Sequence, residues 1–171
     1  RLTGGFRKVS PTGSQISASF SPGLGNFVRV IKIQSDDKVL IGRSSSRVND
    51  TFQSSDGSLR RYTSTGSLDG TFISLTYNGG INDISIDENG KILVGGNFTT
   101  VSGSNYNKFL RLNSDGSKDT SFIIGTGFGT QMSYQVNAIN VQPGGRILVG
   151  GTFLNFNGTS SPFFTALNPD G

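Results

Sequence analysis

A unit of about fifty residues occurs three times along this chain of 171 residues, in the same internal order. Its clearest landmark is a run of three apolar residues closed by glycine, at Val39–Gly42, Ile92–Gly95 and Ile147–Gly150. The three glycines stand 53 and 55 residues apart, a spacing typical of a repeated unit with several strands. One helix or one hairpin is too short to account for it. The sequence therefore predicts a repeat architecture.

Each apolar run follows a short strand of alternating character, and a tight turn joins the two. The alternating segments are 28–33, 81–86 and 136–141, and the last two apolar residues of each share one face. In the turns, Asn89-Gly90 and Gly144-Gly145 reach positive φ at low cost, as a tight hairpin requires. We therefore expect an antiparallel hairpin in every unit.

A third strand and a shorter fourth strand complete the unit. Third strands, each running into a turn that ends in glycine, are predicted at 6–9, 59–62, 109–112 and 164–167. Fourth strands are predicted at 67–72 and 117–122, with a looser copy at 14–20. Four antiparallel strands joined by turns is the composition of a β-propeller blade.

The predicted fold class is all-β, with propeller-type repeats in about three four-stranded antiparallel blades, as part of a larger ring or assembly. The predicted units are a partial repeat over 1–20 and repeats over 21–72, 73–122 and 123–171, the last without its fourth strand. Because the chain begins before a third strand and stops after one, we expect a processed product or an internal piece of a longer array.

The strand pattern also predicts the core and the exposed ends. We expect burial of Ile31, Ile33, Leu40, Ile84, Ile86, Leu93, Ile139, Val141 and Leu148. Units of an array cover only their neighbours, so the two ends are expected to leave apolar surface bare. We expect a partner to cover these ends, near Phe6 and Val9 and near Phe164 and Leu167. The expected partners are other copies or other segments of the same protein.

Composition excludes several classes of function. No apolar stretch approaches the ~20 residues of a membrane-spanning helix, so we expect no membrane insertion. The net charge is +4, but no run of Lys and Arg reaches the length typical of nucleic-acid patches, so no nucleic-acid partner is expected. The absence of Cys and His removes disulfides, thiol metal sites and the usual base of hydrolases. We therefore expect neither catalysis nor a cofactor.

One acidic segment bears on metal binding. Asn113, Asp115 and Asp119 place oxygen ligands near a glycine, faintly like a calcium loop, but the bidentate Glu of an EF-hand is missing. Asp and Asn before Gly are also what β-turns require for local reasons. Turn formation is the favoured interpretation, and Ca²⁺ binding is the alternative.

Aromatic residues in the predicted loops are the other candidates for ligand contact. Tyr77, Tyr106 and Tyr134 do not recur at one register position, and exposed loop aromatics can stack on sugar rings or anchor a protein partner. By contrast, Phe98 and Phe153 recur in register, as do Val101 and Phe156, which indicates packing between blades.

The repeat resembles a known family. An apolar run, Gly-Gly and Phe, followed by Leu-Arg-Leu-Asn-Ser-Asp-Gly-Ser-Lys-Asp-Thr-Ser-Phe in the second unit, is similar to the delta-60 repeat, a β-propeller repeat of bacterial secreted and surface proteins. Ile92–Phe122 and Gln142–Gly171 match this pattern best; Val28–Phe72 matches with Arg43 in place of the second glycine. Kelch repeats share the apolar run and Gly-Gly, but this chain lacks their Trp. A kelch-like propeller is the second possibility, and a β-solenoid is the third.

This resemblance implies a non-catalytic structural and interaction module of an extracellular, cell-surface or virion protein, such as an adhesin, fibre or particle. The alternative is a lectin-like propeller that binds surface glycan in pockets between blades, and repeated equivalent pockets would favour it. A more remote alternative is a carboxylate-based glycosidase, which would need two carboxylates facing one cleft.

Overall fold

The computed structural model describes residue 12 and residues 28–43, 47–48, 51–52 and 57–171. Most of the partial repeat predicted over 1–20, including Phe6 and Val9, lies outside these residues. The described residues form strands, turns and loops, and none of them is helical. The all-β fold class is therefore confirmed.

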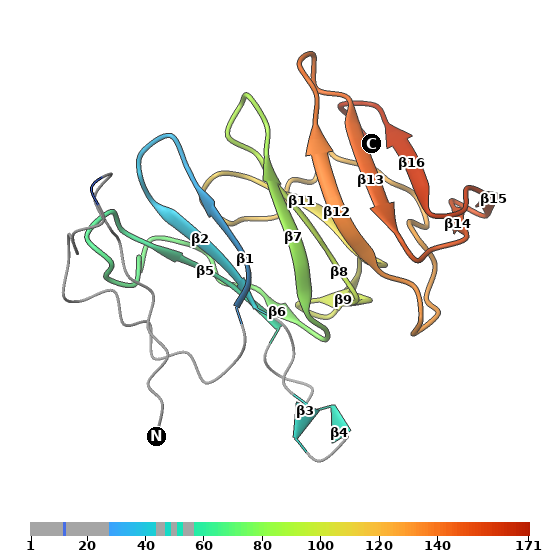
Figure 1. Cartoon of the computed structure of the whole chain (residues 1–171), viewed down its shortest axis with the longest axis horizontal. Helices are drawn as coiled ribbons and strands as arrows, with labels where there is room; N and C mark the ends of the chain where they lie inside the picture. The colour runs from blue at the N-terminus through green and yellow to red at the C-terminus, as the bar shows by residue number, and fades with distance from the viewer. Residues whose placement is uncertain (1–11, 13–27, 44–46, 49–50, 53–56) are drawn as a thin grey trace.

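Three antiparallel sheets stand side by side, the first at the left and the third at the right of Figure 1. The first blade consists of β1 (Val28–Ile33), β2 (Val39–Arg43) and β5 (Gly57–Tyr62). The second blade consists of β7 (Ile81–Ile86), β8 (Ile92–Gly96) and β11 (Phe109–Leu112). The third blade consists of β12 (Val136–Val141), β13 (Ile147–Gly151) and β16 (Phe164–Leu167). Within each of these three ladders the apolar run forms the middle strand.

The glycines that close the apolar runs occupy the same place in all three blades, as predicted. The pairs that face each other across the middle and last strands are Gly42 with Leu59, Gly95 with Phe109, and Gly150 with Phe164. The 53- and 55-residue repeat of the sequence is thus a repeat of three-dimensional structure.

The segments between the middle and last strands contain small hairpins. Their strands are β3 (Arg47–Val48) with β4 (Thr51–Phe52), β9 (Thr100–Val101) with β10 (Ser104–Asn105), and β14 (Asn155–Phe156) with β15 (Thr159–Ser160). A further short strand, β6 (Thr76–Tyr77), pairs with both β5 and β9. It therefore ties the first blade to the second by backbone hydrogen bonds.

The fourth strands predicted at 67–72 and 117–122 are each reduced to one isolated bridge, Tyr62 with Leu68 and Leu112 with Lys118. The reason is local turn chemistry. The carboxylate of Asp69 accepts hydrogen bonds from the backbone and hydroxyl groups of Thr71, and the Phe72 N–H donates to the Asp69 carbonyl. This turn bends the chain away from the ladder soon after the bridge.

Alternation along the strands gives each blade one face toward the blade before it and one toward the blade after it. A Cβ added to Gly42 would lie 2.8 Å from Ile81 and 3.1 Å from Ile84 of the second blade. A Cβ added to Gly95 would meet Val136 and Ile139 of the third blade in the same way. The face of one blade that carries the middle-strand glycine therefore packs on the face of the next blade that carries these valine and isoleucine side chains.

The predicted core is partly correct. Leu40, Ile84, Leu93 and Ile139 are buried, and Ile86, Val141 and Leu148 are half-buried. The prediction is wrong for Ile31 and Ile33, which are 40% and 66% exposed. Their counterparts Ile84 and Ile86 pack toward the preceding blade, whereas the first blade has no described blade on that side. On the same face of the first blade, Ile41 and Tyr62 are buried, so the exposure is confined to the first strand.

Leu93 and Leu148 provide a matched pair for testing this arrangement. Both lie at the same register position of the middle strand, but Leu93 is fully buried between two blades and Leu148 faces away from the second blade. Leu93→Ala should lower the free energy of unfolding by about 2–5 kcal/mol, through lost transfer energy and a cavity. Leu148→Ala should cost less than half as much. Urea unfolding followed by circular dichroism measures both, and equal costs would contradict the assignment of faces.

Candidate functional site

An arginine in the last strand of the first blade holds the turn of the second blade. Arg61 Nε donates to Asp69 Oδ2 at 2.8 Å, and Arg61 Nη1 donates to the carbonyl oxygen of Ser114 in the second blade. Its guanidinium also lies over the ring of Phe72, 4.7 Å from the centroid. We call this group the inter-blade clamp. In this clamp the side chain of Arg61 makes an ion pair, a cation–π contact and a hydrogen bond across the boundary between the blades.

The second blade repeats the clamp on the third. Arg111 Nε donates to Asp119 Oδ2 at 2.8 Å, and Arg111 Nη1 donates to the carbonyl oxygen of Pro169. The ring of Phe122 lies 4.3 Å below the Arg111 guanidinium. Lys91 Nζ adds a second cation, 3.1 Å from the same carboxylate oxygen. The clamp is therefore a repeated device of this fold.

The clamp carboxylates are held in their ionised form. Hydrogen bonds from Thr71, followed by the influence of Arg61, hold the pKa of Asp69 far below its usual range. For Asp119 burial alone would raise the pKa, but hydrogen bonds from Ser121, Lys91 and Arg111 together outweigh burial and lower it strongly. Both carboxylates thus stay charged well into the acidic range.

Two clefts lie beside the clamps at equivalent boundaries between blades. The cleft between the first and second blades has a volume of about 510 Å³ and is lined by Asp36, Lys38, Arg61, Glu88 and Asp115 among others. The cleft between the second and third blades is smaller, about 280 Å³. Glu88 and Asn89, at the tip of the second blade's hairpin, line both clefts. This rim is polar and repeats with the blades.

The structure uses the three candidate calcium ligands within turns and clamps. Asn113 Oδ1 accepts a hydrogen bond from Lys91 Nζ at 2.6 Å, and Asp115 accepts from the backbone and hydroxyl groups of Ser117. Asp119 is the anion of the second clamp. Within the described part of the chain, no three acidic, His or Cys side chains gather as a metal site would require. The turn interpretation accounts for the contacts of these three residues.

The prediction that Tyr77 contacts a ligand is wrong, because this side chain is completely buried. Its ring packs edge-on against Phe98, with centroids 5.2 Å apart. Phe128 also packs on Phe153, the counterpart of Phe98 in the third blade, with the two rings tilted at 53° and their centroids 4.5 Å apart. Tyr77 and Phe128 are thus equivalent, but the segments that carry them differ in length, so sequence alignment does not reveal the match. Burial in this apolar site raises the pKa of Tyr77 strongly.

The other two tyrosines are half-buried. Tyr106 packs against the core between the first two blades, and Lys118 Nζ lies 5.1 Å from the centroid of its ring. Tyr134 packs against the core between the second and third blades. Each leaves part of its ring in reach of solvent, in a different part of the repeat. The structure does not bring the two together into one site.

Sequence reasoning missed Lys108, which is 1% exposed and adjoins a third cleft of about 300 Å³. Its Nζ donates to the carbonyl oxygen of Asn97 at 3.1 Å, and burial lowers its pKa. Its counterpart in the third blade is Phe163, because both residues have positive φ and donate their N–H to the equivalent Phe carbonyl. A lysine just before a predicted strand gives no sign of burial, so only the fold reveals it.

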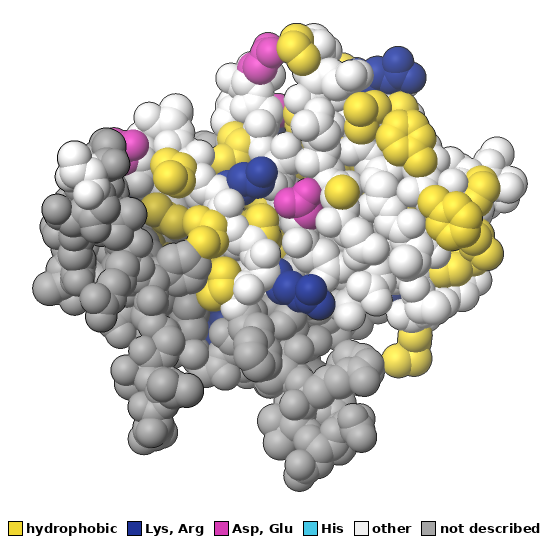
Figure 2. Space-filling view, in the orientation of Figure 1, with side chains coloured by type: hydrophobic (Ala, Val, Ile, Leu, Met, Phe, Trp, Pro, Cys, Tyr) yellow, Lys and Arg dark blue, Asp and Glu magenta, His cyan; other side chains and the backbone are white. Residues whose placement is uncertain are grey.

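One side of the third blade carries an uncovered apolar surface, which we call the free face. It comprises Ala138, Leu148, Gly150, Phe164 and Ala166, which are neighbours across the three strands, and the polar Asn140 lies beside Leu148 on the same face. Figure 2 shows hydrophobic side chains gathered at this end of the molecule. Phe164 is 57% exposed, whereas Leu59 and Phe109, its counterparts in the other blades, are 1% and 0% exposed. The free face is thus an interface surface without its neighbour.

The prediction that both Phe164 and Leu167 lie at the exposed end is half correct. Leu167 is 3% exposed and belongs to the core between the second and third blades. Residues three apart in a strand lie on opposite faces, so Phe164 and Leu167 cannot share one surface.

The free face also lacks the clamp. Ala166 pairs with Leu148 in the third blade, at the place where Arg61 pairs with Leu40 and Arg111 with Leu93. Asp83, whose carboxylate accepts a hydrogen bond from the Ile139 N–H of the third blade, has Ala138 as its counterpart. Charged groups that join the inner blades are therefore replaced by alanine on the free face.

The chain belongs to a β-propeller repeat family. Residues 34–72, 88–122 and 142–171, together more than half of the chain, match the model of the family described as Domain of unknown function (DUF5122) beta-propeller. Each matched segment includes the middle and last strands of one blade. No curated protein and no solved structure matches the chain. In the described part of the chain, no helix has the length and apolar character needed to cross a membrane.

The lowered pKa of the clamp carboxylates predicts how stability depends on pH. A carboxylate with a depressed pKa in the folded state contributes fully above its unfolded pKa of about 3.9, and this contribution is lost as the pH falls toward the folded pKa. Asp119→Asn should therefore lower the free energy of unfolding at pH 7 by about 1–3 kcal/mol. It should also make the loss of stability between pH 5 and pH 2 shallower.

Urea unfolding across this pH range measures both effects. Asp170→Asn, at an exposed turn residue, is the control and should leave the pH profile close to that of the wild type. An unchanged slope in Asp119→Asn would show that the clamp carboxylate does not govern acid stability.

Proposed function

We propose that this chain is a non-catalytic β-propeller module that acts as a scaffold for protein–protein assembly. The observation that carries this proposal is the free face, where Phe164 is 57% exposed at a position that is buried in both other blades. Contiguous exposed apolar surface on a protein in water usually marks an interface. The proposed role is to join neighbouring proteins or segments through this surface.

The setting we propose is an extracellular, cell-surface or virion protein. Support comes from the resemblance of the repeat to the delta-60 repeat of bacterial secreted and surface proteins. The expected partners are further copies or segments of the same protein, or another surface or virion protein. An array of blades suits this role because stability comes from contacts between neighbouring repeats.

The electrostatics of the clamps support a non-catalytic role. A glycosidase needs one carboxyl group with a raised pKa, which can give a proton to the leaving group near neutral pH. Among the described residues, the strongly shifted carboxyl groups are those of Asp69 and Asp119, which have lowered pKa values and lie in ion pairs with Arg61 and Arg111. They are thus suited to holding blades together and unsuited to acid catalysis.

The scaffold proposal predicts that the free face supports association. The wild-type chain should associate with rising concentration, and Phe164→Ser should shift it toward monomer with little change in thermal midpoint, because Phe164 is mostly exposed. Sedimentation velocity measures the association. Met132→Ser, at an apolar residue that is 82% exposed outside the three ladders, is the matched control. A wild-type chain that stays monomeric at every accessible concentration would count against the scaffold.

Glycan binding is a second candidate, favoured by the two polar clefts at equivalent boundaries between blades. If the clefts bind sugars, a glycan array should reveal saturable binding to the wild-type chain. Asn89→Ala should weaken this binding, because Asn89 lines both clefts, whereas Phe164→Ser should not. An array without saturable binding would remove this candidate.

A further inference from the structure

We propose that the cleft beside Lys108 binds a small ligand through a carboxylate group, with the ammonium group of Lys108 as its counter-ion. This cleft has a volume of about 300 Å³, and its described lining residues belong neither to the free face nor to the two polar clefts beside the clamps. The inference is therefore independent of the scaffold proposal and adds a binding site to the second blade.

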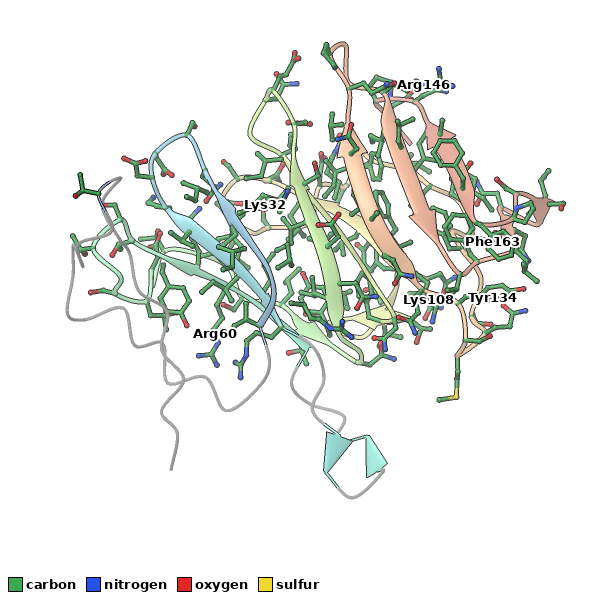
Figure 3. All side chains as sticks on the ribbon, viewed as in Figure 1. Lys32, Arg60, Lys108, Tyr134, Arg146 and Phe163 are labelled. Atoms are coloured by element: carbon green, nitrogen blue, oxygen red, sulfur yellow. The ribbon has the colours of Figure 1, made fainter. Side chains whose placement is uncertain are left out.

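Three segments of the chain form the cleft. The first precedes β7, the second runs between β8 and β11, and the third links the second blade to the third. Besides Lys108, the side chains that they contribute are those of Asn78, Asn97, Thr99, Thr130 and Met132. In Figure 3 the labels of Lys108 and Tyr134 lie near each other, and Tyr134 belongs to the same linking segment as Thr130 and Met132. A ligand in the cleft thus meets amide and hydroxyl groups, one flexible apolar side chain and one cation.

The charge of Lys108 has no counter-ion among the described residues. The ion pairs of these residues belong to Lys38, Arg61, Lys91 and Arg111. Lys108 is nevertheless 1% exposed, and burial lowers its pKa, as expected of a cation without an anion beside it. A buried charge is costly unless it is paired. An anion in the adjoining cleft would supply the missing partner.

The hydrogen bonds of Lys108 also leave room for a ligand. An ammonium group has three N–H donors, and in the described part of the chain Nζ makes one hydrogen bond, to the carbonyl oxygen of Asn97. Hydrogen bonds between an ammonium group and a carboxylate are about twice as strong as those between neutral groups. A ligand carboxylate would therefore satisfy both the charge and the remaining donors.

Asn97 and Thr99 supply further donors beside the cation. Asn97 Oδ1 accepts a hydrogen bond from the Gly80 N–H, which fixes the orientation of the carboxamide. Its Nδ2 donates to none of the described residues and stays available to a ligand. Thr99 Oγ1 accepts from Asn78 Nδ2 at 2.8 Å, so the hydroxyl proton of Thr99 also stays available. One lysine and two neutral donors suit a carboxylate.

The charge and the size of the cleft narrow the ligand class. Lys108 is the charged residue among the described residues that line the cleft. A phosphate dianion would keep an unpaired negative charge there, whereas a carboxylate would be neutralised. The volume of about 300 Å³ is at the lower end of the usual range for ligand pockets. These properties favour a small monoanion, such as a sugar acid or a simple organic acid.

Comparison with the third blade shows that the fold does not require this lysine. Phe163, the counterpart of Lys108, has the same positive φ and the same backbone hydrogen bond, but it is apolar and 61% exposed. The backbone conformation therefore belongs to the repeat, whereas the buried cation belongs to the second blade. A role specific to this cleft accounts for the difference.

The first test uses NMR titration of the isotope-labelled chain with glucuronate, glucose, acetate and inorganic phosphate. Glucuronate should bind saturably and shift the side-chain signals of Lys108 and Asn97. Glucose, which lacks the carboxylate, should bind at least about tenfold more weakly. Tighter binding of glucuronate than of acetate would identify a sugar acid, and equal binding would identify a simple organic acid; both support the carboxylate site. Preference for phosphate over both carboxylates would overturn it.

The second test removes the cation. Lys108→Met should raise the dissociation constant for glucuronate at least about tenfold. The thermal midpoint should stay the same or rise, because the substitution removes an unpaired buried charge. Lys118→Met is the matched control, since Lys118 Nζ also donates to a backbone carbonyl, that of Val101, but Lys118 does not line the cleft. The control should bind glucuronate as the wild type does.

Asn97→Asp tests the site without removing the lysine. The aspartate keeps the acceptor for the Gly80 N–H, but it replaces the Nδ2 donor by a carboxylate oxygen, which repels a ligand carboxylate. Glucuronate binding should be lost while the chain stays folded. Undiminished binding in both Lys108→Met and Asn97→Asp would place the ligand elsewhere and overturn the inference.

Two further outcomes separate this inference from a structural role of Lys108 and from the scaffold proposal. If the wild-type chain binds no carboxylate probe and Lys108→Met lowers the thermal midpoint, Lys108 serves only to hold the Asn97 carbonyl, and the inference falls. Phe164→Ser, which alters the free face, should leave glucuronate binding unchanged. Loss of binding in that variant would contradict the separation of the two surfaces.

Discussion

The structure depends on a close approach of neighbouring blades at one glycine in each middle strand. At Gly42 and Gly95 the next blade comes so near that even a methyl group would overlap its valine and isoleucine side chains. Absence of a side chain on one blade and branched side chains on the next give the close packing that stabilises a core. Because the match repeats with the unit, the sheets stack side by side and need no helix to cover them (Figure 1).

The inter-blade clamp adds directional hydrogen bonds to this apolar contact. Arg61 and Arg111 each pair with an acid of their own blade and reach a backbone carbonyl of the next. Because the geometry needs a carboxylate, a guanidinium and a turn at fixed positions, it favours one relative placement of adjacent blades. Where the arginine becomes Ala166, the chain presents an apolar surface. This contrast between a clamped and an unclamped boundary supports the proposed role of the free face in assembly.

Much of the fold could be predicted from the sequence, and the candidate site could be predicted only in part. The equivalence of Gly42, Gly95 and Gly150 was visible because register within a hairpin is local. The burial of Tyr77 was hidden because the segments between blades differ in length, so its match with Phe128 exists only in space. Local pattern also cannot reveal that the turn at Asp69 ends the fourth strand after one bridge.

The repeat and the three main strands of each unit could be read from the sequence alone, because they follow from periodicity and turn chemistry. Tertiary structure decided which faces of those strands are covered. Ile31 and Ile84 have the same local sequence role, yet Ile31 is 40% exposed and Ile84 is buried against the blade before it. The same holds for Phe164 against Phe109 at the other end. Whether a side chain in a repeat array is buried depends on the adjacent blade that covers it, and the sequence of one repeat does not specify that blade.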